Sequence, residues 1–322
     1  MKKLTIQEAT RLLADGQIVA IPTETVYGLA ADARNGAAVS HIFKAKGRPS
    51  DNPLIVHIGD VSQVDLLATH VSEQARLLMA HFWPGPLTVI LPSAGVVSNL
   101  VTAGLSTVGL RMPSHEATLE LLRTSHIPLA APSANLSGKP SPTCVQHVMH
   151  DLKDQIAGVI DGGICEVGLE STVIDMTLDV PTILRPGGIS KEEIETIIGS
   201  VSISTHSPNQ PKSPGMKYTH YSPAAHVYLV QGSPLYFQKM IKHYKENELK
   251  VGVLCLDPTS GQHPFADVVK GVGKKGKNLY AALREFDEQE VDVILCEVSG
   301  DVAVMNRLMK ASEERMLSEV EN

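Results

Sequence analysis

The sequence predicts an α/β protein with two domains, and three observations support this. Apolar runs typical of buried strands alternate with segments of helical periodicity over residues 1–203. A proline-rich segment over residues 204–225 interrupts this alternation, and a second α/β pattern follows over residues 226–322. Helices interleaved with strands favour a mixed sheet covered by helices in the first domain. The second, smaller domain has a Rossmann-like pattern.

The first domain begins with a helix and a strand. The predicted helix Ile6–Ala14 ends at Asp15-Gly16, and the apolar run Ile18–Ile21 follows until Pro22 stops it. The other predicted helices are Ala37–Ala45, Ser72–Phe82, His115–Thr124 and Thr143–Leu152. The other predicted strands are Leu54–Ile58, Leu87–Leu91, Val108–Met112, Leu129–Ala131, Gly158–Asp161, Ser171–Asp175 and Thr182–Arg185.

The proline-rich segment predicts a linker. It holds Pro208, Pro211, Pro214 and Pro223 among small polar residues, a composition that does not form a packed element. In the domain beyond it, the predicted strands are Val227–Val230, Val251–Leu256 and Val291–Glu297. The predicted helices there are Leu235–Lys245, Asn278–Phe286 and Val302–Met309.

Composition excludes several classes of protein. With 43% hydrophobic and 20% charged residues, the chain is typical of a globular protein rather than a disordered, collagenous or coiled-coil one. Aromatic residues are only 4%, so the core is expected to be mostly aliphatic. The net charge of −7 argues against nucleic-acid binding by the whole molecule, although it leaves room for a local basic cavity.

The expected location is the cytoplasm. The cysteines Cys144, Cys165, Cys255 and Cys296 are scattered without a CxxC pair, which favours free thiols over a disulfide framework or a zinc site. The N-terminal residues lead into a charged helix rather than an apolar signal core. No run reaches the roughly 18–20 apolar residues of a membrane span.

One glycine-rich segment of the second domain imitates a phosphate-binding loop. Gly271–Asn278 fits G-x-G-x-x-G and nearly fits the P-loop pattern. However, Asn278 lacks the hydroxyl that a P-loop requires after its lysine, and the segment does not open the first βα unit of a domain. We therefore interpret it as a glycine-rich helix N-terminus.

Polar residues in the first domain follow predicted strands, where an α/β sheet presents its loops to ligands. Pro22–Leu29 offers Thr and Glu side chains that can bind an amino acid or simply cap the next helix. Lys44, Lys46 and Arg48 surround Gly47, and such a cluster suits a polyphosphate or, alternatively, a solvated helix end.

Further segments extend this set. Ala131–Gly138 offers hydroxyl, amide and backbone N–H groups to an anion. Arg185 ends a predicted strand, Thr107–Pro113 contributes Arg111, and Ser171-Thr172 adds a hydroxyl pair. Each segment alone is compatible with turn chemistry. Together they predict a site of Lys, Arg, Ser, Thr and Asn without a nucleophile–base pair.

These segments carry a family resemblance. The K-x-R of Lys46-Gly47-Arg48 and the S-x-N of Ser133-Ala134-Asn135 resemble the signature of the YrdC-like family. Seven further segments in the same order resemble that family, namely PTETVYGL, KGRPSDNPL, WPGPLT, GLRMP, PSANLSG, ESTVID and LRPGG. The resemblance covers about residues 5–200, and the proline-rich linker with the tail domain resembles the longer, two-domain form. It implies a twisted mixed sheet with helices around a basic concave cavity.

The resemblance also implies an activity, that of an L-threonylcarbamoyladenylate synthase. Such enzymes join L-threonine, bicarbonate and ATP into threonylcarbamoyl-AMP, releasing pyrophosphate and water, for the threonylcarbamoyl adenosine next to the anticodon of tRNA. The implied cofactor is Mg²⁺ arriving with ATP, without a tightly bound protein metal. The implied partners are the three substrates and the downstream tRNA threonylcarbamoyl-transfer machinery, with no membrane.

Site residues are carried over position by position. The signature residues expected to act in catalysis are Lys46, Arg48, Ser133 and Asn135. The positions that match threonine-binding residues are Thr25, His57, Arg111, Ala131 and Ser171. The positions that match ATP-binding residues are Arg48, Asn52, Thr107, Ser133, Ser141, Arg185 and Tyr221. In similar proteins the linker folds over the cavity, which would bring His220 and Tyr221 to the ligand, whereas a mere tether is the alternative.

Two other functions stay open on the sequence. The first is an RNA-binding module, which the negative net charge and the scarcity of aromatic stacking platforms weaken. The second is a carbamoyl-transfer role, as in hydrogenase-maturation proteins that contain a related domain. Those proteins carry zinc-finger and acylphosphatase-like regions that this chain lacks.

Overall fold

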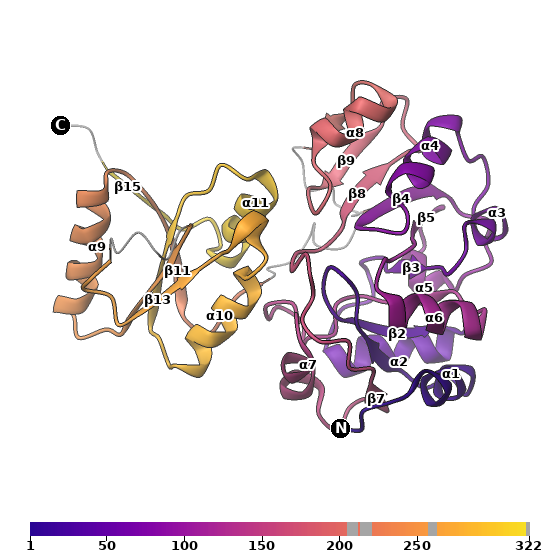
Figure 1. Cartoon of the computed structure of the whole chain (residues 1–322), viewed down its shortest axis with the longest axis horizontal. Coiled ribbons are helices and arrows are strands. Elements are labelled where there is room, and N and C mark those ends of the chain that lie inside the picture. The colour runs from indigo at the N-terminus through magenta and orange to yellow at the C-terminus, as the bar shows by residue number, and fades with distance from the viewer. Residues whose placement is uncertain (205–211, 213–220, 257–262, 320–322) are drawn as a thin grey trace. The chain divides into compact units, whose positions relative to one another are not determined.

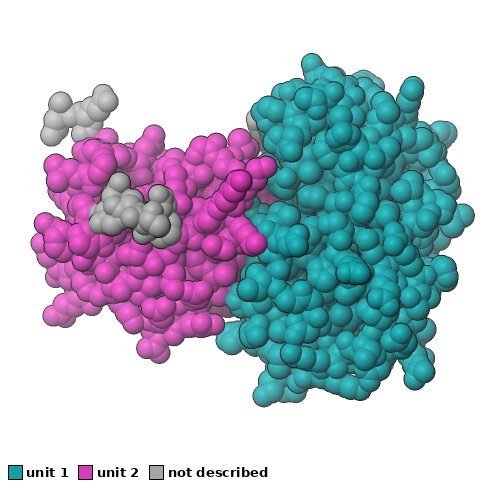
Figure 2. Space-filling model, viewed as in Figure 1, with its two compact units in different colours: residues 1–137, 141–218 teal, residues 138–140, 219–322 magenta. Residues whose placement is uncertain are grey.

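The structure, a computed structural model, describes residues 1–204, 212, 221–256 and 263–319. The chain divides into two compact units (Figures 1 and 2). The first unit comprises residues 1–137 and 141–218, and the second comprises residues 138–140 and 219–322. Of the predicted linker, residues 205–211 and 213–220 lie outside the described residues, and His220 is among them.

A mixed sheet forms the first unit. Among the described residues it has ten strands in the order β10-β9-β8-β4-β5-β3-β6-β2-β1-β7. The strands are β1 (Val19–Ile21), β2 (Gly28–Asp32), β3 (Ile55–His57), β4 (Leu87–Pro92), β5 (Thr107–Arg111), β6 (Leu129–Ala130), β7 (Gly158–Val159), β8 (Thr172–Asp175), β9 (Thr182–Arg185) and β10 (Ser202–Ile203). Parallel pairs such as β3–β5 and β4–β8 alternate with antiparallel pairs such as β4–β5, as a mixed sheet requires.

Helices cover this sheet. They are α1 (Ile6–Ala14), α2 (Gly36–Lys46), α3 (Val64–Leu67), α4 (Glu73–Phe82), α5 (Asn99–Thr102), α6 (Glu116–Ser125), α7 (Val145–Leu152) and α8 (Lys191–Ile198). The Asn35 side chain accepts hydrogen bonds from two backbone N–H groups at the start of α2, which is the usual N-cap arrangement. Gly47 ends α2 with φ of 59°, a left-handed conformation that glycine adopts without steric cost.

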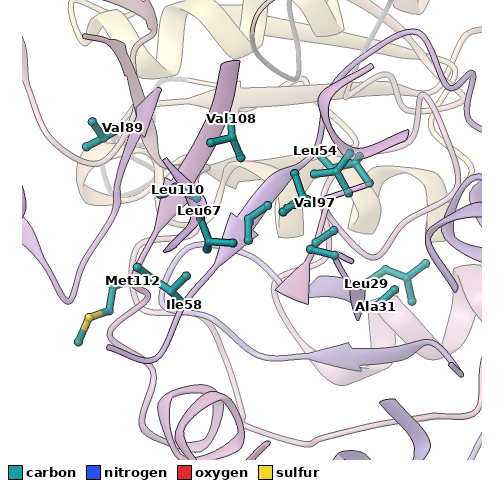
Figure 3. Close-up of a cluster of buried hydrophobic side chains, with 14 of the residues drawn as sticks. Leu29, Ala31, Leu54, Ile58, Leu67, Val89, Val97, Val108, Leu110 and Met112 are labelled. Atoms are coloured by element: carbon teal, nitrogen blue, oxygen red, sulfur yellow. The ribbon is translucent and has the colours of Figure 1, made fainter. Parts of the chain in front are cut away.

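The core of this unit is aliphatic, as the composition predicts. Its largest cluster includes Leu29, Leu54, Val89 and Leu110, all 2% exposed or less. Figure 3 shows part of it, with these four side chains among those labelled. Burial of each such side chain contributes about 1.5–3 kcal/mol, so the sheet gives the site a rigid frame.

Strand β2 is missing from the sequence prediction. It consists of Gly28-Leu29-Ala30-Ala31-Asp32, where small residues and one leucine replace the β-branched residues that mark a strand. In the structure it pairs antiparallel with β1 and β6. Tertiary pairing therefore supplies the strand that local propensity does not predict.

The second unit is a parallel α/β layer structure. Its described part has five strands in the order β13-β12-β14-β11-β15, and every pair is parallel. They are β11 (His226–Gln231), β12 (Val251–Cys255), β13 (Val268–Gly271), β14 (Val293–Glu297) and β15 (Met316–Ser318). Helix α9 (Pro234–Glu246) covers one face, while α10 (Leu279–Glu288) and α11 (Val302–Ala311) cover the other (Figure 1).

Three features noted in the sequence can be compared with the structure. Gly271 ends β13 and Asn278 directly precedes α10, so the glycine-rich segment is a helix N-terminus, in agreement with the interpretation from sequence. The four cysteines are free. No helix in the described part of the chain is long and apolar enough to cross a membrane.

Candidate active site

Lys46 joins the two signature segments. It is the last residue of α2 and is 3% exposed. Its Nζ donates hydrogen bonds to the carbonyl oxygens of Ser133 (2.5 Å) and Asn135 (2.6 Å), in the loop that follows β6. The buried ammonium thus fixes the S-x-N loop to the end of the helix.

Arg48 and Asn52 lie on the loop that leaves α2. The Arg48 Nη2 group donates to the Asn52 carbonyl oxygen (3.2 Å) and lies 3.4 Å from that of Pro53. The Asn52 side chain is fully buried, and neither its Oδ1 nor its Nδ2 has a hydrogen-bond partner among the described residues. A buried amide without partners costs about 1–3 kcal/mol per group, so this arrangement suits a residue that binds a ligand.

Arg111 lies among the residues that are predicted to bind threonine. It ends β5, is 4% exposed, and donates to the Thr25 hydroxyl (2.9 Å) and the Gly85 carbonyl oxygen (3.3 Å). Its Nη2 lies 2.7 Å from Oε1 of Glu24, which is equally buried. This contact pairs the Arg111 charge with a buried carboxylate. Glu24 therefore neutralises Arg111 inside the protein.

His57 is the strand neighbour of Arg111. The two residues pair in register between β3 and β5, and His57 is 3% exposed. Burial, aided by the nearby Arg111 charge, lowers the pKa of His57 to about 3. Its Nδ1 has no hydrogen-bond partner in the described part of the chain. The side chain is therefore a neutral imidazole at physiological pH.

Ser171 and Arg185 form a second buried group. The Arg185 Nη2 group donates to both the carbonyl oxygen (3.0 Å) and the hydroxyl (3.1 Å) of Ser171. The Ser171 hydroxyl also lies 2.8 Å from that of Thr88, on the neighbouring strand β4. Beside them, the Ser141 hydroxyl donates to Oε1 of Glu170 (2.6 Å). Hydrogen bonds thus orient each of these hydroxyls.

Three further candidate site residues, Ala131, Thr107 and Tyr221, lie outside the groups described so far. Ala131 donates its N–H to the carbonyl oxygen of Ile55 (3.0 Å), which puts it beside β3. Thr107 begins β5 and lines a small cavity. Tyr221 belongs to the second unit, where it stacks on Tyr280 with ring centroids 5.1 Å apart.

The structure therefore connects the sequence candidates in three groups. The groups, by the contacts described above, are Lys46 with Ser133 and Asn135; Thr25, His57 and Arg111; and Ser171 with Arg185. Sequence reasoning missed Glu170 and Thr88 and did not assign Glu24. The signal for the two acids was a carboxylate next to a candidate hydroxyl, since Glu24 precedes Thr25 and Glu170 precedes Ser171.

No dedicated metal centre is visible in the described ranges. Within them, no group of three or more His, Cys, Asp or Glu could hold a metal ion.

Comparison with known proteins identifies the family. The Sua5/YciO/YrdC family model, described as telomere recombination, matches residues 11–187. A second model, for the C-terminal domain of threonylcarbamoyl-AMP synthase, matches residues 189–313. The chain belongs to the Sua5/YciO/YrdC family. The resemblance found in the sequence is thereby confirmed, including the two-domain form.

Individual relatives match over almost the whole chain. The threonylcarbamoyl-AMP synthase of Bacillus subtilis is 50% identical over 97% of this chain and 94% of its own length. The crystal structure of Pyrococcus abyssi Sua5 complexed with L-threonine has a TM-score of 0.93 at 46% identity, covering 98% of this chain and 96% of that one. The predicted fold class, a large mixed sheet plus a smaller parallel α/β domain, is therefore confirmed.

Proposed function

We propose that the protein is an L-threonylcarbamoyladenylate synthase, which converts L-threonine, bicarbonate and ATP to threonylcarbamoyl-AMP, pyrophosphate and water. The observation that carries this proposal is the match, at 50% identity over 97% of the chain, to a threonylcarbamoyl-AMP synthase. The similarity to a structure of Sua5 complexed with L-threonine supports the same substrate here. The enzyme class is therefore nucleotidyltransferase.

The threonine side of the site consists of Thr25, His57, Arg111, Ala131 and Ser171. Its central group is Arg111, whose charge the buried Glu24 carboxylate balances. A guanidinium binds a carboxylate through paired N–H groups, which suits the carboxylate of threonine. The neutral His57 adds a hydrogen-bonding nitrogen without adding charge.

The nucleotide side of the first unit consists of Arg48, Asn52, Thr107, Ser133, Ser141 and Arg185. Tyr221 is a further ATP contact that the family resemblance implies. The cations of the nucleotide side suit the phosphates of ATP, and the buried Asn52 amide offers both a donor and an acceptor. Mg²⁺ is expected to enter with ATP, because this ion keeps several waters and binds mainly through substrate phosphates. Lys46 and Asn135 complete the signature by holding the loop of Ser133 against α2.

The chemistry follows in two steps. The amine of threonine attacks bicarbonate, and a C–N bond forms as water leaves to give a carbamate. A carbamate oxygen then attacks the α-phosphorus of ATP, and the bond to the β-phosphate bridge breaks to release pyrophosphate. Positioning and charge neutralisation supply most of the acceleration in such transfers, which suits a site of Lys, Arg and hydroxyls.

The chemistry of the product indicates which further partners to expect. A mixed anhydride of a carbamate and AMP is an activated acyl donor, so a downstream transfer machinery is expected to move the threonylcarbamoyl group to the adenosine beside the anticodon of tRNA. Direct RNA contact by this chain is a separate expectation. A cytoplasmic location is part of the same proposal.

The test is pyrophosphate release from ATP by the purified protein. We expect release only when L-threonine and bicarbonate are both present, at one pyrophosphate per adenylate formed. Release that ignores threonine, from protein shown to be folded by circular dichroism, would contradict the proposal. RNA affinity that falls steeply with salt, without nucleotide turnover, would favour the RNA-binding alternative instead.

A further inference from the structure

An ion pair connects the proline-rich segment to the sheet of the first unit. Asp175 ends β8, and its side chain is fully buried. Its Oδ2 lies 2.9 Å from Nζ of Lys212, whose side chain is 34% exposed. The other carboxylate oxygen, Oδ1, accepts hydrogen bonds from the N–H (2.9 Å) and the hydroxyl (2.6 Å) of Thr177. Lys212 is therefore attached to the sheet although it lies in the segment predicted to be a linker.

The ion pair lies on the face of the sheet that carries the nucleotide candidates. Strand register aligns Ile55, Gly109, Ile90 and Asp175 in one row across β3, β5, β4 and β8. Along this row, Ile55 and Ile90 pack with Val173. Because side chains alternate along a strand, Asp175 and Val173 share a face.

Lys212 reaches a cavity on this face. The cavity is lined by Thr88 and Thr107 from two strands, with Lys212 and the apolar side chains of the row. Thr107 is one of the proposed ATP contacts, whereas Thr88 bonds to Ser171 of the threonine side. The ammonium of Lys212 thus lies near one residue of the proposed nucleotide side.

The chemistry of the two side chains explains their pairing. A lysine ammonium on a flexible four-carbon chain has no fixed position by itself. A carboxylate with no exposed surface requires a cation or several hydrogen bonds. Asp175 has both, because Thr177 orients the carboxylate and Lys212 neutralises it. The buried partner therefore determines where the exposed one stands.

We propose that Asp175 is a positioning residue that holds Lys212 at this small cavity near Thr107, and that Lys212 contributes there to the binding of ATP. This inference rests on the proposed function, because it takes ATP as the substrate. It adds Lys212, which lies outside the sequence motifs, and gives a role to Asp175, the last residue of the ESTVID segment.

The test compares Michaelis constants for the two substrates in three variants. We expect Lys212→Met and Asp175→Asn each to raise KM for ATP about tenfold, the order expected for loss of one charge-assisted contact. KM for L-threonine should stay within about twofold, because the threonine side does not contact the pair. Lys212→Arg keeps the charge and should retain most of the ATP affinity.

Lys191→Met is the matched control. Lys191 has a similar side-chain exposure of 33% and also forms an ion pair, with Glu195 on α8, in the same unit. We expect both Michaelis constants to be unchanged in this variant. ATP binding measured by calorimetry on the same proteins provides a readout independent of turnover.

The outcomes separate this inference from the proposed function. If the wild-type protein makes no adenylate, the proposed function fails first. If the wild-type protein is active and Lys212→Met has an unchanged KM for ATP, only the positioning role is overturned. An equal rise of both Michaelis constants would also overturn it, because it would indicate a general disturbance of the unit.

Discussion

The ammonium of Lys46 donates to the backbone carbonyls of Ser133 and Asn135, which lie 87 and 89 residues further along the chain. This contact joins the end of a helix to a loop that follows a central strand of the sheet. The two halves of the family signature are therefore parts of one structure. The Lys46 ammonium therefore fixes the geometry of the loop and also contributes to the local electrostatic potential.

The first prediction concerns Lys46. Lys46→Met removes both hydrogen bonds and should lower kcat/KM about 100-fold, because a displacement of about 1 Å in a positioned loop costs that much. The control is Lys44→Met on the same helix, since Lys44 is exposed. Steady-state kinetics of adenylate formation should leave the Lys44 variant at wild-type activity. Similar losses in both variants would contradict a specific role for Lys46.

The second prediction concerns the pair of Arg111 and Glu24, which are 4% exposed each. Arg111→Met leaves the Glu24 carboxylate buried without its cation and should lower the free energy of unfolding by about 3–5 kcal/mol. The double variant Arg111→Met with Glu24→Gln should recover most of that stability but not the affinity for threonine. Urea denaturation and threonine titration measure the two effects. Recovery of threonine affinity in the double variant would exclude Arg111 as a threonine ligand.

The third prediction concerns His57 and pH. Its pKa in the folded protein is about 3, below the ordinary value of 6.5, so the unfolded chain binds more protons between these values. The free energy of unfolding should therefore fall as the pH is lowered from 6.5 towards 3. At pH 5 this contribution is about 2 kcal/mol.

Denaturation of wild type and His57→Gln at pH 7 and pH 5 tests this prediction. The wild-type protein should lose about 2 kcal/mol more than the variant between these two pH values. Equal losses would mean that His57 titrates normally in the folded protein. Because His57 stays neutral above pH 5, the activity should show no titration with its ordinary pKa.

The fourth prediction concerns Tyr221. The residue is 5% exposed; its ring packs on Tyr280, and Cζ of Arg307 is 5.9 Å from the ring centroid. Tyr221→Ala should impair adenylate synthesis while the protein stays folded, as expected of an ATP contact. Tyr221→Phe keeps the ring, so it separates the hydroxyl from the stacking. Wild-type turnover with unchanged ATP binding in Tyr221→Ala would leave the linker as a tether.

Much of the fold could be predicted from sequence because its strands are short apolar runs. The run Leu87–Leu91 predicts β4. The run Val108–Met112 predicts β5, which ends at Arg111 in the structure. Strand β2 could not be predicted, because its alanines carry no strand preference. The strands β10, β13 and β15 were missed as well. Of these, β15 is a three-residue strand that pairs with β11.

The candidate site was predictable only in part, for a different reason. Motifs name the residues that meet substrate, but the partners of those residues lie far away in sequence. Glu24 pairs with Arg111, and Asp175 pairs with Lys212 from a proline-rich segment. Neither pair has a local spacing rule of the kind that links side chains within one helix. Their contacts depend on the register of the sheet and on how distant segments of the chain fold back onto it. Both are seen in the structure.

The most direct test of the account is incorporation of ¹⁴C-bicarbonate into an adenylate by the purified wild-type protein, with L-threonine present or omitted. The account predicts a labelled adenylate only when threonine and ATP are both present, and little label with Lys46→Met. Label that forms equally well without threonine, or no label from folded protein with all three substrates, would contradict it.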